Sequence, residues 1–183
     1  MNPKVSVVVP VYNSESFLEE CLNNLLSQTL KEIEIIIIND GSTDNSLEII
    51  KEFSKKDSRI KFVTTKNQGV GKARNEGICL SMGDYVAFLD PDDTFPYVYT
   101  LENLYNAATK NNAKICGGSF WEYNPVTGVE QTSHLGPYAG FDFNKDGWIE
   151  YKEYQFDYGY YRFLYDRKFL LKHKIFFPPY SRY

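Results

Sequence analysis

An almost unbroken run of isoleucine, Ile33–Ile38, is the feature of this sequence that most constrains its fold. A strand with one face in water alternates apolar and polar residues, whereas a strand that is apolar on both faces is typical of the centre of a parallel sheet covered by helices. The β-branched run Val5–Val11 has the same character. The two runs therefore predict a buried, mostly parallel sheet flanked by helices.

Strand-like and helical patterns alternate through the first two thirds of the chain. We expect strands at 5–11, 33–38, 60–64, 85–89 and 114–120, and helices at about 17–26, 46–55, 70–82 and 97–111. Connections of this length join parallel strands through right-handed strand–helix–strand units. The predicted fold class is therefore α/β, with a Rossmann-like sheet over residues 1–120. Residues 121–183, where the alternation stops, are expected to complete the same domain with a small β-hairpin and a helical segment.

Composition excludes several functional classes. The net charge of −4 leaves no basic excess for binding nucleic acid. The three cysteines are odd in number, widely spaced and without a CxxC pair, which disfavours a disulfide framework or a zinc site and favours a reducing compartment. The amino terminus lacks the pattern of a signal peptide, and no apolar run approaches the length of a membrane span. We therefore expect a cytoplasmic protein.

Three polar loops follow the first, second and fourth predicted strands: Tyr12–Ser16, Asn39–Asp44 and Asp90–Asp93. The carboxyl ends of parallel strands meet at one edge of the sheet, where ligands bind in such folds. The three carboxylates of the last loop repel one another by roughly 3 kcal/mol per pair at ~5 Å and an effective dielectric of about 20. A divalent cation relieves that repulsion, and oxygen-only ligands favour Mg²⁺ or Mn²⁺, which complete their coordination with phosphate oxygens and water. The other interpretation is a solvated acidic turn that caps the next helix.

Two further loops have both a structural and a functional interpretation. Thr43 or Asp44 could cap the following helix, but Asp40 stands directly at the end of a buried strand, where a carboxylate can accept the imide N–H of a pyrimidine base. The segment Asn67–Asn75 has a GxG at a helix start, yet Arg74 stands where the dinucleotide-binding fingerprint requires glycine, which disfavours dinucleotide binding. Its exposed amides and two cations suit a diphosphate.

Four segments together resemble family 2 glycosyltransferases of the GT-A fold: VSVVVPVYNSESFLEECLNNLLSQT, EIIIINDGSTDNS, NQGVGKARNEGI and GDYVAFLDPDD. The resemblance is specific because four separate motifs agree in order and spacing, and it covers Lys4 to about Lys114. Residues 151–183 look like the later part of bacterial members that build capsular, cell-wall or exopolysaccharide glycans. The resemblance implies transfer of a sugar from a UDP-sugar donor to a glycan or lipid-linked saccharide acceptor, with Mn²⁺ or Mg²⁺ as cofactor.

The resemblance also implies a set of residues that bind the nucleotide. They are Pro10, Val11, Tyr12, Asp40, Asn67, Lys72, Arg74 and Asp90. Tyr12 would lie against the base, and Asp40 would bind uracil. The cations Lys72 and Arg74, with Asn67, would lie beside the base and the diphosphate.

The metal site of the family falls on the acidic loop. Asp92 would be the main metal ligand, Asp90 would contact the ribose or the metal, and Asp93 would support the acceptor side. In this mechanism the metal neutralises charge on the leaving diphosphate while an acceptor hydroxyl attacks the anomeric carbon with inversion. A carboxylate general base removes the hydroxyl proton.

The general base of the family is not found in this sequence. It is usually the Asp of a Glu-Asp pair that follows a segment shaped like Ile175–Tyr183, and the sequence stops at that point. Asp157 and Asp166 do not match the motif, so the base is expected beyond Tyr183. We therefore expect an amino-terminal fragment of a longer enzyme, in which residues 121–183 are the incomplete acceptor side. The alternative is a nucleotide-sugar-binding module without turnover.

A competing motif at 142–153 fits the EF-hand calcium loop at every constrained position. The calcium ligands would be Asp142, Asn144, Asp146 and Glu153. An EF-hand needs a helix on each side, and the preceding segment, SHLGPYAGF, is a poor helix. We therefore favour a β-hairpin, with FDF and WIEY as strands and Asn-Lys-Asp-Gly as the turn.

Aromatic residues make up 16% of the chain and gather in residues 151–183. Packing on the sheet is their favoured role. Stacking on acceptor sugars is the second interpretation. Peripheral contact with the inner face of a plasma membrane that holds a lipid-linked acceptor is the third, supported by the basic residues Arg167, Lys168, Lys172 and Lys174. A neighbouring copy of the chain in a homo-oligomer is a further way to cover exposed aromatics.

Overall fold

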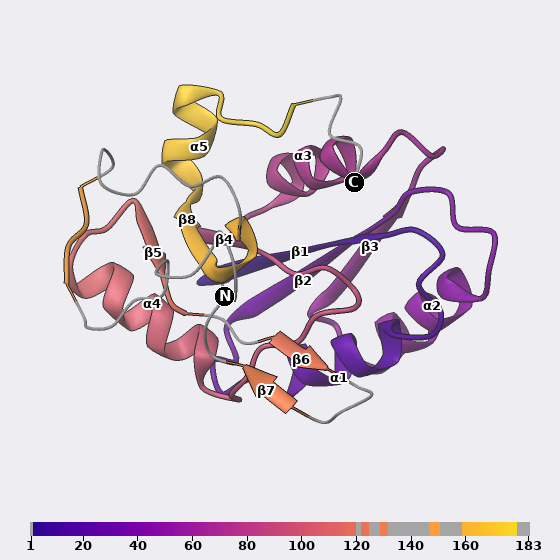
Figure 1. The fold of residues 1–183 in the computed structure, drawn as a ribbon. Helices are drawn as coiled ribbons and strands as arrows, with labels where there is room; N and C mark the ends of the chain where they lie inside the picture. The colour runs from indigo at the N-terminus through magenta and orange to yellow at the C-terminus, as the bar shows by residue number, and fades with distance from the viewer. Residues whose placement is uncertain (1, 120–121, 125–128, 132–146, 151–158, 179–183) are drawn as a thin grey trace.

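A six-stranded sheet forms the centre of the fold in this computed structural model, which describes residues 2–119, 122–124, 129–131, 147–150 and 159–178 (Figure 1). Its strands are β1 (Val5–Val11), β2 (Ile33–Asn39), β3 (Ile60–Thr64), β4 (Tyr85–Phe88), β5 (Ile115–Gly117) and β8 (Phe163–Asp166). Their order across the sheet is β3-β2-β1-β4-β8-β5. β1, β2, β3 and β4 are parallel, whereas β8 runs antiparallel to β4 and β5.

Helices cover both faces of this sheet. They are α1 (Leu18–Ser27), α2 (Ser46–Lys56), α3 (Val70–Leu80), α4 (Thr100–Lys110) and α5 (Arg167–His173). In Figure 1, α1, α2 and α4 lie below the sheet, and α3 and α5 lie above it. The chain therefore forms three layers, as alternating strands and helices predict.

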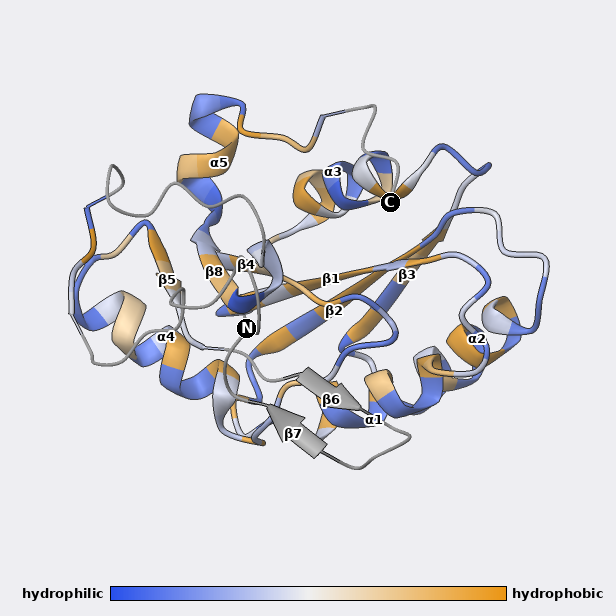
Figure 2. Cartoon of the chain, viewed as in Figure 1, coloured by the Kyte–Doolittle hydropathy of each residue, from blue (hydrophilic) through white to orange (hydrophobic). Residues whose placement is uncertain are grey.

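The core lies on both sides of the central strands. In β1, Val9 packs with α1, α2 and α4, while its neighbour Val8 packs with α3 and α5. In β2, Ile37 belongs to the first cluster, and Ile38 packs with Ala73 of α3. Every residue of β1 and β2 is buried, and Figure 2 shows apolar residues along the central strands. The run of isoleucine is thus explained by burial on both faces, and the predicted α/β sheet is confirmed.

The strand β8 was not predicted from the sequence. It lies between β4 and β5, where Tyr85 pairs with Asp166 and Ile115 pairs with Tyr165. Four residues are too few to show an alternating pattern, and their partners lie far away along the chain. The aromatic segment therefore showed only helical character, which α5 confirms in part. β8 also joins residues on both sides of position 120 into one sheet.

The helix α4 begins at Thr100, later than the periodicity predicted, because α1 holds the loop before it. Asn24 accepts from the N–H of Phe95 at 2.9 Å and donates to its carbonyl at 2.9 Å. Gln28, fully buried, donates to the carbonyl of Tyr97 at 3.0 Å. These side-chain amides bond backbone groups of Phe95 and Tyr97 and hold the loop of bends and turns that precedes the helix.

The small hairpin of the structure is not the one predicted. It consists of β6 (Glu122–Asn124) and β7 (Val129–Gln131). The predicted second strand, WIEY, is not formed over its described residues, since 147–150 contain no strand. Most of the calcium-loop positions of 142–153 lie outside the described residues, so calcium binding stays a prediction. In the described part of the chain, no helix combines the length and apolarity that crossing a membrane requires.

A buried carboxylate is fully bonded at the amino ends of the strands. Glu34 of β2 is 3% exposed and accepts from Ser6 Oγ at 2.6 Å, from the N–H of Met82 at 2.7 Å and from Lys61 Nζ at 2.8 Å. Burial acts to raise the pKa of Glu34, but the hydrogen bonds from Lys61, Ser6 and Met82 outweigh it and hold that pKa below its usual value. This network ties β1, β2 and β3 to the turn before β4.

Candidate functional site

The loops after β1 and β2 are bonded to each other at the carboxyl ends of the strands. The N–H of Glu15 donates to Asp44 Oδ2 at 2.9 Å, and the N–H of Ser14 donates to Ser46 Oγ at 2.9 Å. Asp44 also accepts from the N–H of Ser46 at 3.0 Å, so it binds the first turn of α2. Burial acts to raise the pKa of Asp44, yet its hydrogen bonds with Ser46 and Glu15 lower it overall. Asp44 therefore has the structural role that the sequence left open for it.

Asp40 organises the loop that precedes α3. The residue is 4% exposed, and its Oδ1 accepts from Thr65 Oγ1 at 3.0 Å and from the N–H of Gln68 at 2.9 Å. Its Oδ2 accepts from the N–H of Gly69 at 2.8 Å. Gly69 has φ +93°, a left-handed conformation that glycine adopts without strain. The carboxylate expected at uracil thus already binds three donors of its own chain.

The other residues expected at the nucleoside differ in exposure. Pro10 and Val11 are buried in β1, whereas Tyr12, the next residue, is 50% exposed. Asn67 and Lys72 are exposed on the loop before α3 and on its first turn. The structure therefore leaves an aromatic ring, an amide and a cation accessible at this edge of the sheet.

Arg74 of α3 is the ion-pair partner of Asp90, which follows β4. Its Nη2 donates to the two carboxylate oxygens at 2.7 and 2.9 Å. Arg74 is 3% exposed, and its guanidinium carbon lies 4.6 Å from the ring centre of Tyr160 and 5.3 Å from that of Phe177. The hydroxyl of Tyr160 also donates to Asp90 Oδ2, at 3.0 Å. Arg74, expected beside the diphosphate, thus lies inside the protein against Asp90.

The rest of the acidic loop is less constrained. Asp92 is exposed, and Asp93 is half-buried. Burial, followed by the negative charges of Asp92 and Asp90, raises the pKa of Asp93 to about 6. Within the ranges that the structure describes, no three His, Cys, Asp or Glu side chains form a group spaced for a metal ion. The oxygen donors and the crowding of negative charge still suit Mg²⁺ or Mn²⁺, because a divalent cation relieves such repulsion.

Sequence reasoning missed Tyr160. It begins a short 3₁₀ turn, η2 (Tyr160–Arg162), and lies 70 residues from Asp90 along the chain. The segment around it is rich in aromatic residues and carries no motif, so no local signal distinguishes this tyrosine from its neighbours.

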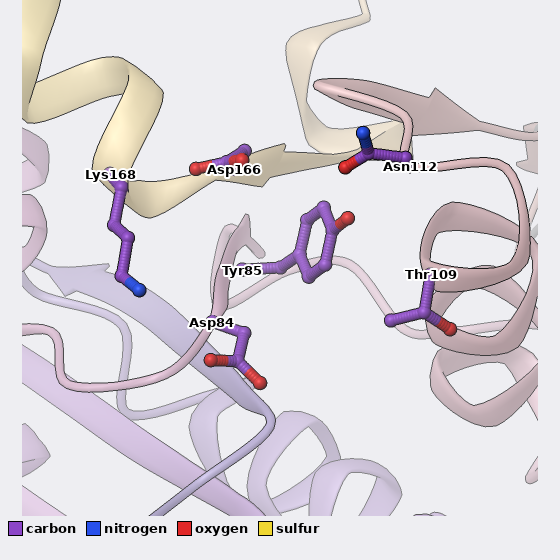
Figure 3. Close-up of a pocket in the computed structure, with 6 residues that line it drawn as sticks. All are labelled: Asp84, Tyr85, Thr109, Asn112, Asp166 and Lys168. Carbon is purple, nitrogen blue, oxygen red and sulfur yellow. The ribbon is translucent and has the colours of Figure 1, made fainter.

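Two cavities lie outside these loops. One, of about 220 Å³ near the amino end of β4, is lined by Asp84, Tyr85, Thr109, Asn112, Asp166 and Lys168 (Figure 3). Figure 3 shows Lys168 and Thr109 on opposite sides of the Tyr85 ring. Tyr85 donates to the carbonyl of Ala113 at 3.0 Å, and Asp166 pairs with Lys114 at 2.6 Å, so bonds within the chain already engage these polar groups. The other cavity, of about 210 Å³, is lined mainly by apolar residues and adjoins the site through Tyr160 and Phe177.

The sequence model of the family described as "Glycosyl transferase family 2" matches residues 6–175. The chain belongs to this family. Glycosyltransferase GlyA of Streptococcus pneumoniae serotype 4 is 43% identical to it over 136 residues, which are 74% of this chain and 19% of GlyA.

Solved structures agree with this family and with the GT-A fold that the sequence predicted. S. aureus TarS 1–349 matches with a TM-score of 0.80 at 26% identity, over 98% of this chain and 52% of TarS 1–349. Its complex with UDP-GlcNAc gives 0.78 at 26% identity, over 96% and 48%. The mannosyltransferase PcManGT from Pyrobaculum calidifontis, in complex with GDP-Man and Mn²⁺, shares the fold with a TM-score of 0.56 at 24% identity, over 69% of this chain and 37% of PcManGT. The chain thus spans about half the length of TarS 1–349 and about a fifth of GlyA.

Proposed function

We propose that this chain forms the donor-binding part of a glycosyltransferase that uses a UDP-sugar and a divalent cation. One arrangement supports this proposal. The carboxylates of Asp90 and Asp92 follow β4, and β4 and β2 both pair with β1, so the ends of three strands are adjacent. Ligands of such sheets bind at this edge, and the fold is shared with TarS, which has been crystallised with UDP-GlcNAc.

The nucleoside is proposed to bind over the end of β1. The exposed ring of Tyr12 can stack on a base, with Pro10 and Val11 at the strand end beside it. Asp40 is proposed to accept the imide N–H of uracil. Thr65 and Gly69 each donate one hydrogen bond to Asp40, while the N–H of Gln68 is shared between its two carboxylate oxygens. A carboxylate offers about four lone-pair sites, so uracil would replace one branch of that shared contact.

The diphosphate is proposed to lie at the start of α3. Lys72 is exposed on the first turn of this helix, whose free amides carry partial positive charge, and Asn67 is exposed on the loop before it. Asp92, with Asp90, is proposed to hold Mn²⁺ or Mg²⁺. When bound, the cation neutralises charge on the leaving diphosphate.

The acceptor is proposed to be a glycan or a lipid-linked saccharide whose hydroxyl attacks with inversion. Asp93 is proposed to support the acceptor side of the site. We assign the general base to no described residue. A second candidate is a nucleotide-sugar-binding chain without turnover, because no described residue is assigned as the general base. Release of UDP from UDP-sugars by this chain would show turnover and would exclude the second candidate.

Calorimetric titration with UDP and Mn²⁺ tests the proposed donor site. We expect saturable binding that EDTA abolishes and that Asp92→Ala weakens about tenfold or more. Asp84→Ala is the matched control, because Asp84 is an exposed carboxylate at the opposite end of β4. Absence of UDP binding, or equal binding by the Asp92→Ala variant, would contradict the proposal. A thermal-shift screen of UDP-sugars with Mn²⁺ then identifies the donor, because a ligand of the folded state raises its apparent stability.

A further inference from the structure

Tyr160 brings a hydrogen-bond donor from the carboxyl-terminal part of the chain to Asp90. Its hydroxyl lies 3.0 Å from Asp90 Oδ2. Burial, and then the charge of Asp90, raise the pKa of Tyr160, so the phenol stays protonated and donates. Asp90 therefore accepts from two elements: α3 through Arg74, and η2 through Tyr160.

The same tyrosine holds the guanidinium of Arg74. The ring centre of Tyr160 lies 4.6 Å from the guanidinium carbon, and the ring of Phe177 lies 5.3 Å from it. Nη2 of Arg74 binds Asp90, while Nε and Nη1 are buried and have no hydrogen-bond partner among the described residues. Asp90 is thus the anchor of Arg74, and the two aromatic rings restrict where the guanidinium can move.

Further contacts hold the two rings in place. The side chain of Asn75 bonds both the N–H and the carbonyl of Phe177, at 2.8 and 2.9 Å. The hydroxyl of Tyr165 donates to the carbonyl of Tyr160 at 3.1 Å, and the ring of Tyr160 packs edge-on against Phe88 at 6.1 Å. Tyr160 is therefore positioned by neighbours from α3, β4 and β8 as well as by Tyr161 of its own short turn, whose ring lies 5.6 Å away.

We infer that Tyr160 is a positioning residue for the donor site: with Arg74, it fixes the orientation of the Asp90 carboxylate. The inference rests on the proposed function, because Asp90 is proposed to contact the ribose or the metal. Arg74 binds Asp90 through a single nitrogen, Nη2, so without a second donor the carboxylate could rotate about that nitrogen. The hydroxyl of Tyr160 engages Oδ2 separately and removes that freedom, so the remaining lone pairs of Asp90 point in a constant direction.

Tyr160→Phe tests this role, since it keeps the ring over Arg74 and removes only the hydroxyl. We expect the affinity for UDP with Mn²⁺ to fall about tenfold, the lower end of the effect of a hydrogen bond to a charged group. Tyr85→Phe is the matched control. The Tyr85 hydroxyl also donates at 3.0 Å, to the carbonyl of Ala113 at the other end of β4, so this variant should keep wild-type affinity.

A second readout needs no nucleotide. In ¹⁵N-labelled protein, the guanidinium signals of Arg74 should be resolved, because the ion pair and the two rings slow rotation about the Nε–Cζ bond. Tyr160→Phe frees the carboxylate that anchors Arg74 and should broaden and shift these signals, whereas Tyr85→Phe should leave them unchanged.

The two readouts separate the inference from the proposed function. If the wild-type chain does not bind UDP, the proposed donor site is wrong, and the Arg74 signals alone decide whether Tyr160 orients Asp90. If Tyr160→Phe binds UDP like the wild type, or if the two variants lose equal affinity, the positioning role is overturned. Unchanged Arg74 signals in Tyr160→Phe overturn it as well.

Discussion

Carboxylates at the two ends of the sheet differ in how completely they are hydrogen-bonded. At the amino ends of the strands, Glu34 is buried and accepts from three donors. At the carboxyl ends, Asp92 has no hydrogen-bond partner within the described part of the chain, and Asp93 has a pKa raised to about 6 by burial and by its two acidic neighbours. Unrelieved charge costs stability. The amino end therefore serves folding, while the carboxyl end keeps groups that a cation or a nucleotide would satisfy.

Buried donors show the same contrast. Asn39 Nδ2 and two nitrogens of Arg74 have no partner among the described residues, and both side chains lie near the carboxyl ends of the strands. Arg59 Nη1, near the amino end of β3, is an exception, although other nitrogens of Arg59 bind Asp57. An unpaired buried donor costs about 1–3 kcal/mol, so the two side chains with such donors at the carboxyl ends are a sign of function there.

The largest expected effect on stability is at the amino end. Glu34→Ala removes the acceptor of Ser6 and Met82 and leaves a cavity, so the free energy of unfolding should fall by about 3 kcal/mol in urea denaturation. The affinity for UDP at low temperature should be unchanged. Glu32→Ala, which removes a partly exposed ion pair with Lys4, is the control and should lower the free energy of unfolding far less than Glu34→Ala does. If folded Glu34→Ala did not bind UDP, the conclusion that the amino end serves folding and not binding would be wrong.

Asp40 is the exception to this contrast, because it lies at the carboxyl end but is bonded as completely as Glu34. Asp40→Asn places an NH₂ group against backbone donors, and we expect a loss of about 2 kcal/mol in the free energy of unfolding together with weaker UDP binding. Urea denaturation and calorimetry measure the two effects. Asp84→Asn, at an exposed position, should change stability by less than about 0.5 kcal/mol. Wild-type stability in Asp40→Asn would show that the loop 65–69 does not depend on this carboxylate.

The smallest expected effect is the pH dependence caused by Asp93. Its pKa is about 6 in the folded chain against a reference of 3.8, so the folded state holds the proton more tightly than the unfolded state. This contribution to stability is complete below about pH 4 and is lost as the pH rises through about 6. Asp93→Asn cannot ionise, so it does not lose stability over this pH range. The free energy of unfolding of this variant relative to the wild type should therefore increase by about 1 kcal/mol between pH 4 and pH 7, after allowance for partial solvent screening.

Urea denaturation of both proteins across this pH range measures that difference. Mn²⁺ should reduce it, because a bound cation lowers the cost of ionised carboxylates. A difference that stays constant with pH would show that Asp93 ionises as it does in the unfolded chain, and the contrast between the two ends would then rest on the unpaired donors alone.

The sequence by itself determined the layers of the fold and the edge that carries the site. Burial on both faces is a property of the strand's own residues, so Ile33–Ile38 and Val5–Val11 indicated a parallel sheet covered by helices. Parallel strands bring their carboxyl ends to one edge, and the polar loops after three of these strands therefore had to meet there. The order and spacing of the four motifs were enough to identify the family.

Only the tertiary structure decided what each polar side chain touches. Arg74 binds Asp90 across 16 residues, Asp40 binds the loop before α3, and Tyr160 reaches Asp90 across 70 residues. The strand β8 likewise pairs with strands that lie far from it along the chain, β4 and β5. Such contacts depend on how elements that are distant in the sequence pack together. The sequence pattern around each residue does not indicate them, because it is the same whether or not the contact forms. The position of a carboxylate at a strand end could be predicted, but its orientation, which depends on Tyr160, could not.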